Sequence, residues 1–186
     1  MQRSGIRDIF EAMVNYRRVQ QSGGTFFFTV TLRDRSSMLL TRYIDELRFA
    51  FRETGLRKPF KINAIAILPD HLHCLWTLPS GDTNYSGRWR SIKSSFVRKL
   101  RKSGVQVGMN EKGEADVWQR RFWEHQIRGD KDFEAHVNYI HINPVKHGLV
   151  KNVIDWPWSS FHDYVREGLL DLNWASESVA CGGFGE

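Results

Sequence analysis

The hydrophobic residues of the chain recur with two different periods, and the changes between them divide the sequence into strands and helices. Residues 23–32 (GGTFFFTVTL) combine β-branched and aromatic side chains after two glycines, which is typical of a buried strand. Across residues 36–55, apolar side chains recur every three or four positions behind two serines that can cap a helix. Gly55 is expected to end this helix.

The middle of the chain predicts a β-hairpin followed by a helix. Residues 61–68 and 71–78 each have the composition of a strand, and the Pro69-Asp70 pair between them suits a tight turn. Residues 88–102 then place apolar side chains at helical spacing. The second strand of the hairpin therefore leads into a helix.

The last third of the chain predicts one more strand and one more helix. Residues 116–127 (DVWQRRFWEHQI) alternate aromatic and charged side chains, as a strand with one exposed face does. A helix is expected to begin at Asp130, which can cap it. The helix should end near Asn143, because Pro144 disfavours the helical conformation of the residue before it.

The order of these elements is β-α-β-β-α-β followed by a helix, which predicts an α+β fold of the split β-α-β, or ferredoxin-like, kind. Its antiparallel sheet carries two helices on one face and leaves the other face for the extra helix or a ligand. We expect a single domain over residues 1–176, with its core at 23–150, a packed extension at 151–176 and a flexible tail at 177–186. Four aromatic side chains should pack the extension onto the core: Trp156, Trp158, Phe161 and Tyr164.

Composition narrows the class of protein. The chain has 186 residues, 41% hydrophobic and 26% charged, which is enough to bury a core without disulfides. No apolar run approaches the roughly 18 residues of a membrane span, and the first residues lack a signal-peptide core. Cys74 and Cys181 lie far apart, which favours reduced thiols. We therefore expect a cytoplasmic protein with no membrane partner.

The charge favours a polyanionic partner. The net charge is +6 with a pI near 9.5, and residues 88–102 contain seven basic side chains and no acidic one. A solvated helix face is the alternative explanation of that run. Basic pairs flanked by aromatic residues near the start and in 118–123 add weight to nucleic acid, because rings stack on unpaired bases. The predicted nucleic-acid-binding residues are Arg17, Arg18, Arg88, Arg90, Lys93, Arg98, Lys99, Arg101, Lys102, Arg120 and Arg121.

Two histidines in the hairpin are candidate metal ligands. Side chains alternate along a strand, so His71 and His73 point to one face while Leu72, Cys74 and Trp76 point to the core. Two imidazoles on adjacent pleats can share one cation if a third ligand comes from elsewhere. The alternative is a pair of histidines on a half-exposed sheet face, and the spacings typical of zinc sites do not occur here.

The last helix offers a tyrosine on one side. Counting by three and four residues from Tyr139 reaches His136 and Asn143, so the three side chains line one side of a helix. Tyr139 could equally lie at the edge of the core, and Asn143 could cap the helix end. In a basic chain whose sheet has one open face, however, the histidines and the tyrosine together favour a shared site.

Phosphodiester cleavage by a tyrosine nucleophile fits this set of residues. A cation held by His71, His73 and the Asn143 oxygen would orient the scissile phosphate and stabilise the leaving 3′ oxygen. Tyr139 would attack in line and form a 5′-phosphotyrosine that a later hydroxyl resolves. A phenol of pKa about 10 needs positive charge or a base nearby, and His136 is a possible assisting group.

The chain resembles the HUH (His-hydrophobic-His) nucleases with one catalytic tyrosine and, among them, the REP-associated tyrosine transposases. The resemblance rests on five stretches, in this order: YRRVQQSGGTFFFTVTLRDR, LPDHLHCLWTLP, WQRRFWEH, HVNYIHINPVKHGLV and DWPWSSFHDY. It implies a ferredoxin-like core, and Mg²⁺ or Mn²⁺ held by the two histidines and the residue one turn after the tyrosine, here Asn143. Manganese suits imidazole and amide ligands at least as well as magnesium.

The resemblance also implies a substrate and leaves alternatives open. It implies single-stranded DNA that is cut and rejoined near palindromic repeats folded as hairpins, by a monomer or a dimer. A basic protein that binds hairpins without cutting them is the alternative, and a metal-dependent hydrolase of small substrates is a weaker one. Glu124 and His125 should face opposite ways on their strand, so at most one can approach the site, and structural hydrogen bonds are the expected role of both.

Overall fold

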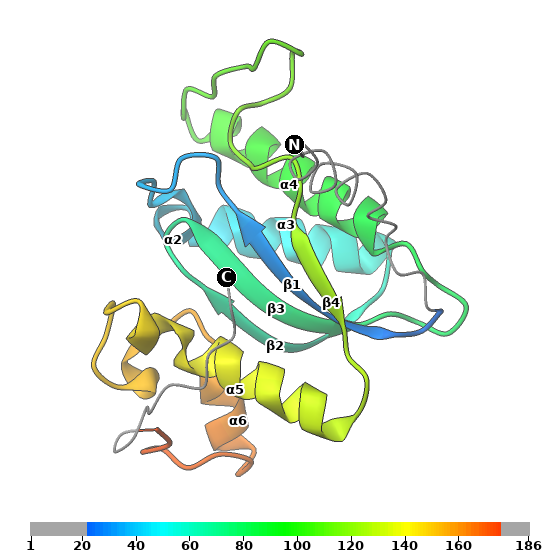
Figure 1. Ribbon diagram of the computed structural model, residues 1–186. Coiled ribbons are helices and arrows are strands. Elements are labelled where there is room, and N and C mark those ends of the chain that lie inside the picture. The colour runs from blue at the N-terminus through cyan, green and yellow to red at the C-terminus, as the bar shows by residue number, and fades with distance from the viewer. Residues whose placement is uncertain (1–21, 176–186) are drawn as a thin grey trace, which may run out of the picture.

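The computed structural model describes residues 22–175, and its centre is a four-stranded antiparallel sheet with the order β2-β3-β1-β4 (Figure 1). The strands are β1 (Thr25–Thr31), β2 (Lys61–Ile67), β3 (His71–Thr77) and β4 (Trp123–Gln126). This order confirms the predicted split β-α-β arrangement, with β1 and β3 in the middle. Four predicted features lie outside the described residues: Arg17, Arg18, Cys181 and the tail at 177–186.

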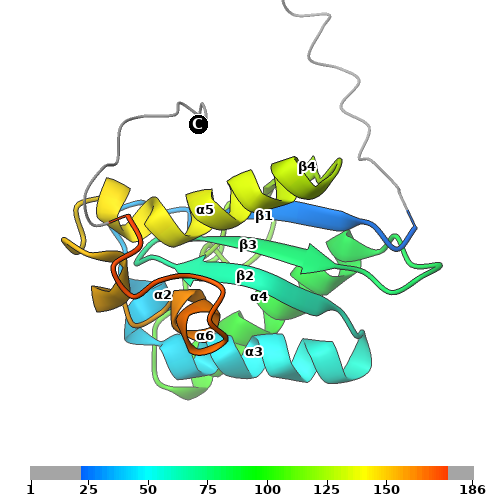
Figure 2. The ribbon, with the colours of Figure 1, turned by 90° about the horizontal axis from the view of Figure 1, so that it is seen from below.

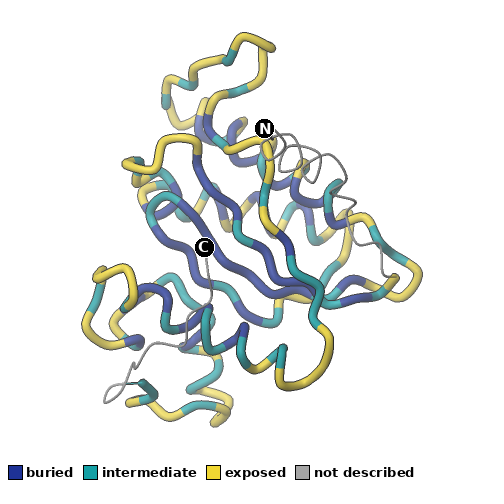
Figure 3. Tube along the Cα trace, in the orientation of Figure 1, coloured by how far each residue is buried: buried dark blue, intermediate teal, exposed yellow. Residues whose placement is uncertain are grey.

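The two faces of the sheet carry different helices (Figure 2). On one face, α3 (Ile44–Arg57) and α4 (Tyr85–Lys102) pack on the large apolar core, which includes Phe28 and Trp76. On the other face, α5 (Asp130–Lys146) packs on a smaller core that includes Phe27 and Leu75. Alternation along β1 and β3 produces this division. The central strands are buried along most of their length, as Figure 3 shows.

The helix predicted at 36–55 is two helices in the structure. The chain forms α2 (Leu39–Arg42), leaves helical geometry at Tyr43 with φ −117° and ψ 46°, and continues as α3. The break lets Leu40 and Leu47 both be fully buried. Gly55 does not end the second helix, which runs on to Arg57, since an interior glycine costs only about 1 kcal/mol.

The strand predicted at 116–127 is much shorter. Pairing runs from Phe26 with Gln126 to Thr29 with Trp123, and Leu32 then forms an isolated bridge with Trp118. Three steps along β1 therefore correspond to five steps on the partner segment. The extra residues must leave the ladder, as in a bulge, and this interrupts the predicted strand.

The last helix also differs at both ends. Asp130 is the first residue of α5 rather than its cap, which is Gly129. Pro144 lies inside the helix, which reaches Lys146, so the predicted end at Asn143 is wrong. The proline removes one donor in the last turn only, and the Asn143 carbonyl still accepts from the His147 amide at 3.0 Å.

The extension after α5 covers the edge of the sheet that β2 forms, as expected of a packed aromatic tail. It contains a 3₁₀ turn (Val153–Asp155) and α6 (Phe161–Arg166). The Ile67 amide donates to the Trp158 carbonyl at 2.9 Å, and the Trp156 ring nitrogen donates to the Ile67 carbonyl at 3.0 Å. These bonds satisfy the outer edge of β2. Between residues 22 and 175, every helix is too short or too polar to cross a bilayer.

Candidate active site

The two candidate histidines lie side by side on β3, and both are buried. The centroids of the His71 and His73 rings are 5.0 Å apart. His71 Nδ1 lies 2.8 Å from Asp70 Oδ1, and His73 Nδ1 lies 2.9 Å from Thr29 Oγ1. When Nδ1 donates a hydrogen bond, the lone pair of the imidazole is on Nε2. Each ring is therefore held with one nitrogen suited to a metal.

The hairpin turn supplies the group that orients His71. Asp70 follows Pro69 in the turn, and Arg35 Nε lies 2.5 Å from Asp70 Oδ2 on the other side of the carboxylate. Burial alone would raise the pKa of Asp70, but the hydrogen bond from His71 and the Arg35 pair hold it below its usual value. A charged carboxylate behind a histidine fixes the ring and makes it a better ligand.

The tyrosine of α5 reaches the same place, as the sequence predicted. The Tyr139 ring lies 5.2 Å from the His73 ring and 5.8 Å from the Phe27 ring, between centroids. Lys146 Nζ lies 4.9 Å from the centre of the Tyr139 ring. The phenol and the imidazole pair therefore share one part of the sheet surface.

Asn143 completes this arrangement from the next turn of α5. It is 1% exposed, and its amide lies against the His73 imidazole. Within the described residues, neither Asn143 Oδ1 nor His73 Nε2 has a hydrogen-bond partner. A buried nitrogen lone pair and a buried amide oxygen without partners are costly unless something binds them. These residues therefore fit a cation.

The surroundings of His73 keep its imidazole ring neutral. Burial is the main cause that lowers the pKa of His73 well below its usual value, and the nearby His71, His147 and Lys146 add to it. The ring is therefore neutral at neutral pH, which is the form that binds metal ions.

A cavity of about 470 Å³ opens beside these side chains. We call it the Tyr139 cavity. Its lining comprises Phe27, Thr29, Arg35, His71, His73, Trp123, His125, Asp132, Ala135, His136 and Tyr139. Four of them are site residues that the sequence predicts. The cavity has room for a phosphate group next to the phenol.

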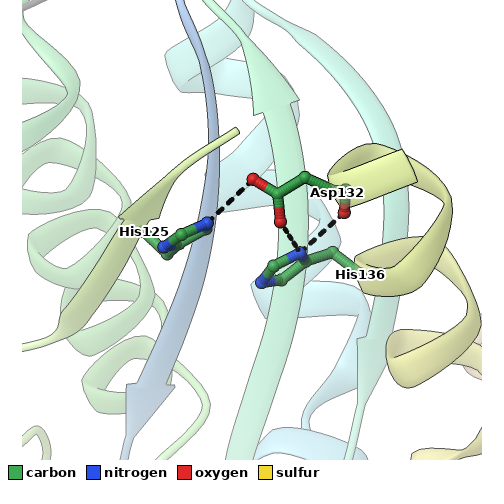
Figure 4. Close-up of side chains that lie close together, drawn as sticks. All are labelled: His125, Asp132 and His136. Atoms are coloured by element: carbon green, nitrogen blue, oxygen red, sulfur yellow. Dashed lines mark hydrogen bonds and ion pairs between the residues drawn. The ribbon is translucent and has the colours of Figure 1, made fainter. Parts of the chain in front are cut away.

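A second polar group lies in the same cavity and was not predicted as a group. His125 Nε2 lies 3.0 Å from Asp132 Oδ2, and His136 Nδ1 lies 3.0 Å from Asp132 Oδ1 (Figure 4). Donor atoms of the three residues all fall within 4.8 Å of one another, an arrangement that can hold a metal ion. Glu124 faces α4 instead and accepts a hydrogen bond from the Tyr85 hydroxyl at 3.3 Å. The two neighbours on β4 therefore do face opposite ways.

His147 was also missed. Its ring lies 4.9 Å from the His71 ring, between centroids. His147 follows Asn143 by four residues, so it continues the side of the helix that carries Tyr139. The four-residue spacing from Asn143 could have identified His147, but the helix was predicted to end at Asn143.

Most of the predicted nucleic-acid-binding residues lie on the α4 side of the sheet, opposite the face that carries Tyr139. A cavity of about 980 Å³ runs between α4 and the segment after it. We call it the basic groove. Six of the predicted residues line it: Arg90, Lys93, Arg98, Arg101, Lys102 and Arg120. Arg121 lines a hollow at the β4 edge, and Lys99 lies over the Phe49 ring, 3.5 Å from its centre.

The prediction for Arg88 is wrong. Its side chain is 2% exposed, and Nη2 lies 2.7 Å from Asp82 Oδ2 and 2.7 Å from the Pro59 carbonyl. The Arg88 hydrogen bond is the main cause that lowers the pKa of Asp82. Arg88 ties the start of α4 to neighbouring loops and is not available to a partner.

Comparison with known proteins identifies the class of protein that has this fold and this arrangement of histidines and tyrosine. The model of the family described as "Transposase IS200 like" matches residues 21–143, about two thirds of the chain. The protein belongs to this transposase family.

Individual relatives are similar over almost their full lengths. The chain is 49% identical over 165 residues to the REP-associated tyrosine transposase of Escherichia coli K12, covering 89% of this chain and 93% of that protein. A Haemophilus influenzae relative is 48% identical over 164 residues. A solved structure described as a REP-associated tyrosine transposase bound to a REP hairpin matches with a TM-score of 0.80 at 48% identity, covering 94% of this chain and 98% of that one.

Proposed function

We propose that this protein is a divalent-metal-dependent endonuclease and strand transferase that acts on single-stranded DNA. It cleaves at or near hairpin-forming palindromic repeats and forms a covalent 5′-phosphotyrosine. The observation that carries the proposal is that the His71 and His73 imidazoles and the Tyr139 phenol lie in one cavity. A protein that only bound hairpins would need none of these side chains there.

The metal ligands in this proposal are His71, His73 and Asn143. Their donor set of two imidazoles and one amide oxygen suits Mn²⁺ at least as well as Mg²⁺. A divalent cation bound there would draw electron density from the scissile phosphate and lower the barrier to loss of the 3′ oxygen. Asp70 and Thr29 hold the two rings in the required orientation.

Tyr139 is the nucleophile. Its phenolic oxygen attacks the phosphorus, the bond from phosphorus to the 3′ oxygen breaks, and the 3′ oxygen leaves and takes up a proton. The 5′ phosphate stays on Tyr139 until another hydroxyl attacks it and releases the phenol. Lys146 Nζ lies over the Tyr139 ring and adds positive charge beside it. His136 lines the same cavity one turn earlier on α5 and is the candidate to assist proton transfer.

The shape of the surface supports a DNA substrate. The basic groove shares Gln119 and Phe122 with the hollow of about 340 Å³ at the edge of β4, and that hollow shares Thr29 and Trp123 with the Tyr139 cavity. Concave surface thus continues from one face of the sheet to the other. Trp123 is 54% exposed on this path, where its ring can stack on a base. The similar protein solved with a REP hairpin supports the same substrate class.

The test is cleavage of labelled single-stranded hairpins, taken from the DNA around the protein's own gene, in the presence of Mn²⁺. The intact protein should yield a denaturation-resistant adduct. Tyr139→Phe should still bind the hairpin but form no adduct, whereas Tyr43→Phe, a control on the far side of the sheet, should behave as the intact protein. Cleavage by Tyr139→Phe would falsify the assignment of Tyr139 as the nucleophile. Hairpin binding without cleavage by the intact protein, with or without metal, would favour the non-catalytic alternative.

A further inference from the structure

We propose that His125, Asp132 and His136 form a second cation site, which takes a divalent transition metal. The three residues come from two elements, because His125 lies on β4 while Asp132 and His136 lie one turn apart on α5. Figure 4 shows the Asp132 carboxylate between the two imidazoles. This site is separate from the one assigned to His71 and His73.

The distances are close to those a metal requires. With metal–ligand bonds of about 2.1 Å, the ligands of a tetrahedral ion lie about 3.4 Å apart. The carboxylate oxygens of Asp132 already lie 3.0 Å from His125 Nε2 and 3.0 Å from His136 Nδ1. All three donors lie within 4.8 Å. The two rings are stacked, with centroids 4.8 Å apart and planes 12° apart, so both imidazoles lie on the same side of the structure as the carboxylate that joins them.

The carboxylate is held in place without the ion. The Arg128 amide donates to Asp132 Oδ2 at 2.9 Å, which anchors the side chain in the first turn of α5. Hydrogen bonds from His125 and the Arg128 amide, together with the charges of His125 and His136, keep the pKa of Asp132 below its usual value, although burial opposes them. The charged carboxylate meets the first requirement of a cation site. The ion would replace the proton between His125 and the carboxylate, and the proton that His136 Nδ1 shares between the carboxylate and the Asp132 carbonyl, which lies 2.8 Å away.

The ligand types select the ion. Two imidazoles and one carboxylate favour Zn²⁺, Mn²⁺ and similar transition metals, whereas Mg²⁺ and Ca²⁺ prefer oxygen ligands alone. The His125 and Asp132 side chains are 31% and 27% exposed, so an ion and its water can enter from solvent. Three protein ligands and an open position are typical of sites where the metal meets a substrate.

The Phe27 ring packs against both groups. Its centroid lies 4.9 Å from that of His136 and 5.6 Å from that of His73. We assign a separate ion to each group. Because both groups line the Tyr139 cavity, a cation held by Asp132 would add positive charge to the wall that faces DNA in the proposed function. The presence of the ion itself does not depend on that function.

The test is a count of bound metal on the full chain by equilibrium dialysis against Zn²⁺, followed by Co²⁺ absorption spectra. The intact protein should bind two ions. Asp132→Asn should bind one, and Asp130→Asn, the matched control in the same helical turn, should bind two. The double variant His71→Leu with His73→Leu should keep one ion, and its Co²⁺ spectrum should vanish when Asp132→Asn is added. Excess Mg²⁺ should not displace this ion.

Two results would overturn the proposal. One is an unchanged count and affinity in Asp132→Asn, and the other is a double histidine variant that binds no ion. His125→Gln, a change on the edge strand, gives a second reading if Asp132→Asn unfolds, and it too must lose one ion. The intact chain could also bind a single ion. If that ion is lost in Asp132→Asn but kept in the double variant of His71 and His73, the result would support this site and contradict the proposal that His71 and His73 bind a metal.

Discussion

The two faces of one sheet differ in the kind of side chain that they bury. Facing α3 and α4, rings such as Phe28 and Trp76 pack edge to face, with centroids 4.7 Å apart, in a continuous apolar core. Facing α5, β3 buries the polar ring of His73 against Asn143, and within the described residues His73 Nε2 and Asn143 Oδ1 have no hydrogen-bond partner. The first face supplies the larger apolar core, and the second buries the polar side chains that the proposed function uses as ligands.

The largest effect should come from breaking the apolar face. Phe28 is fully buried among aromatic rings, so Phe28→Ala should lower the free energy of unfolding by about 3–5 kcal/mol. Urea denaturation measures this loss. Phe49→Ala, at a 37% exposed position, is the control and should cost far less. Equal losses in the two variants would show that this face is not the main source of stability.

A substitution on the face that packs against α5 should affect stability little and cleavage strongly. His73→Leu replaces a buried ring that has an unpartnered nitrogen with an apolar side chain but removes the hydrogen bond between Nδ1 and Thr29 Oγ1, so stability should fall by only about 1 kcal/mol. Cleavage should fall by about a thousandfold, since loss of a metal ligand removes several kcal/mol of transition-state stabilisation. Urea denaturation and hairpin cleavage are measured on the same sample. A stable variant that cleaves at the normal rate would exclude His73 as a ligand.

Another histidine of α5, His141, predicts a pH dependence of stability. Burial lowers the pKa of His141 to about 4, from an ordinary value of 6.5. Between these values the unfolded chain binds a proton that the folded chain does not. Stability should therefore fall as the pH drops from about 6.5 to 4, by up to about 3 kcal/mol, and this contribution is constant outside that window. His141→Gln should flatten this part of the curve measured by urea denaturation, and an unchanged slope would assign it to other groups.

The smallest effect concerns the group behind a ligand. Asp70→Asn keeps the shape of the turn but weakens the hydrogen bond to His71 Nδ1. Metal affinity or cleavage should fall about 10–100-fold. Titration of cleavage against Mn²⁺ measures the shift, with Asp116→Asn, a carboxylate paired with Arg33, as the control. A shift of similar size in both variants would point to general loss of negative charge rather than to His71.

The parts of the fold and site that depend on local periodicity were predictable. Alternation along residues 71–78 placed His71 and His73 on one face, and helical spacing placed Tyr139 and Asn143 on one side of α5. The topology of the sheet then brought the two sets together. These inferences needed only the period of each element and the order of the elements.

The parts that failed depend on partners distant in sequence. The grouping of His125 with Asp132 requires the register of β4 on β1 and the placement of α5, neither of which is a local property. The burial of Arg88 depends on Asp82 and on loop carbonyls, so a basic run concealed one structural arginine. Pro144 predicted a helix end at Asn143, but α5 packs on the sheet and continues through the proline to Lys146.

The most direct test of the central claim is to locate the covalent bond. After reaction with a hairpin and Mn²⁺, digestion by trypsin should give a peptide of residues 132–146, in which Tyr139 is the single tyrosine. We predict that mass spectrometry finds the 5′-phosphonucleotide on this peptide, and that the modification disappears when metal is chelated. An adduct on any other peptide, or one formed equally well without metal, would contradict the account.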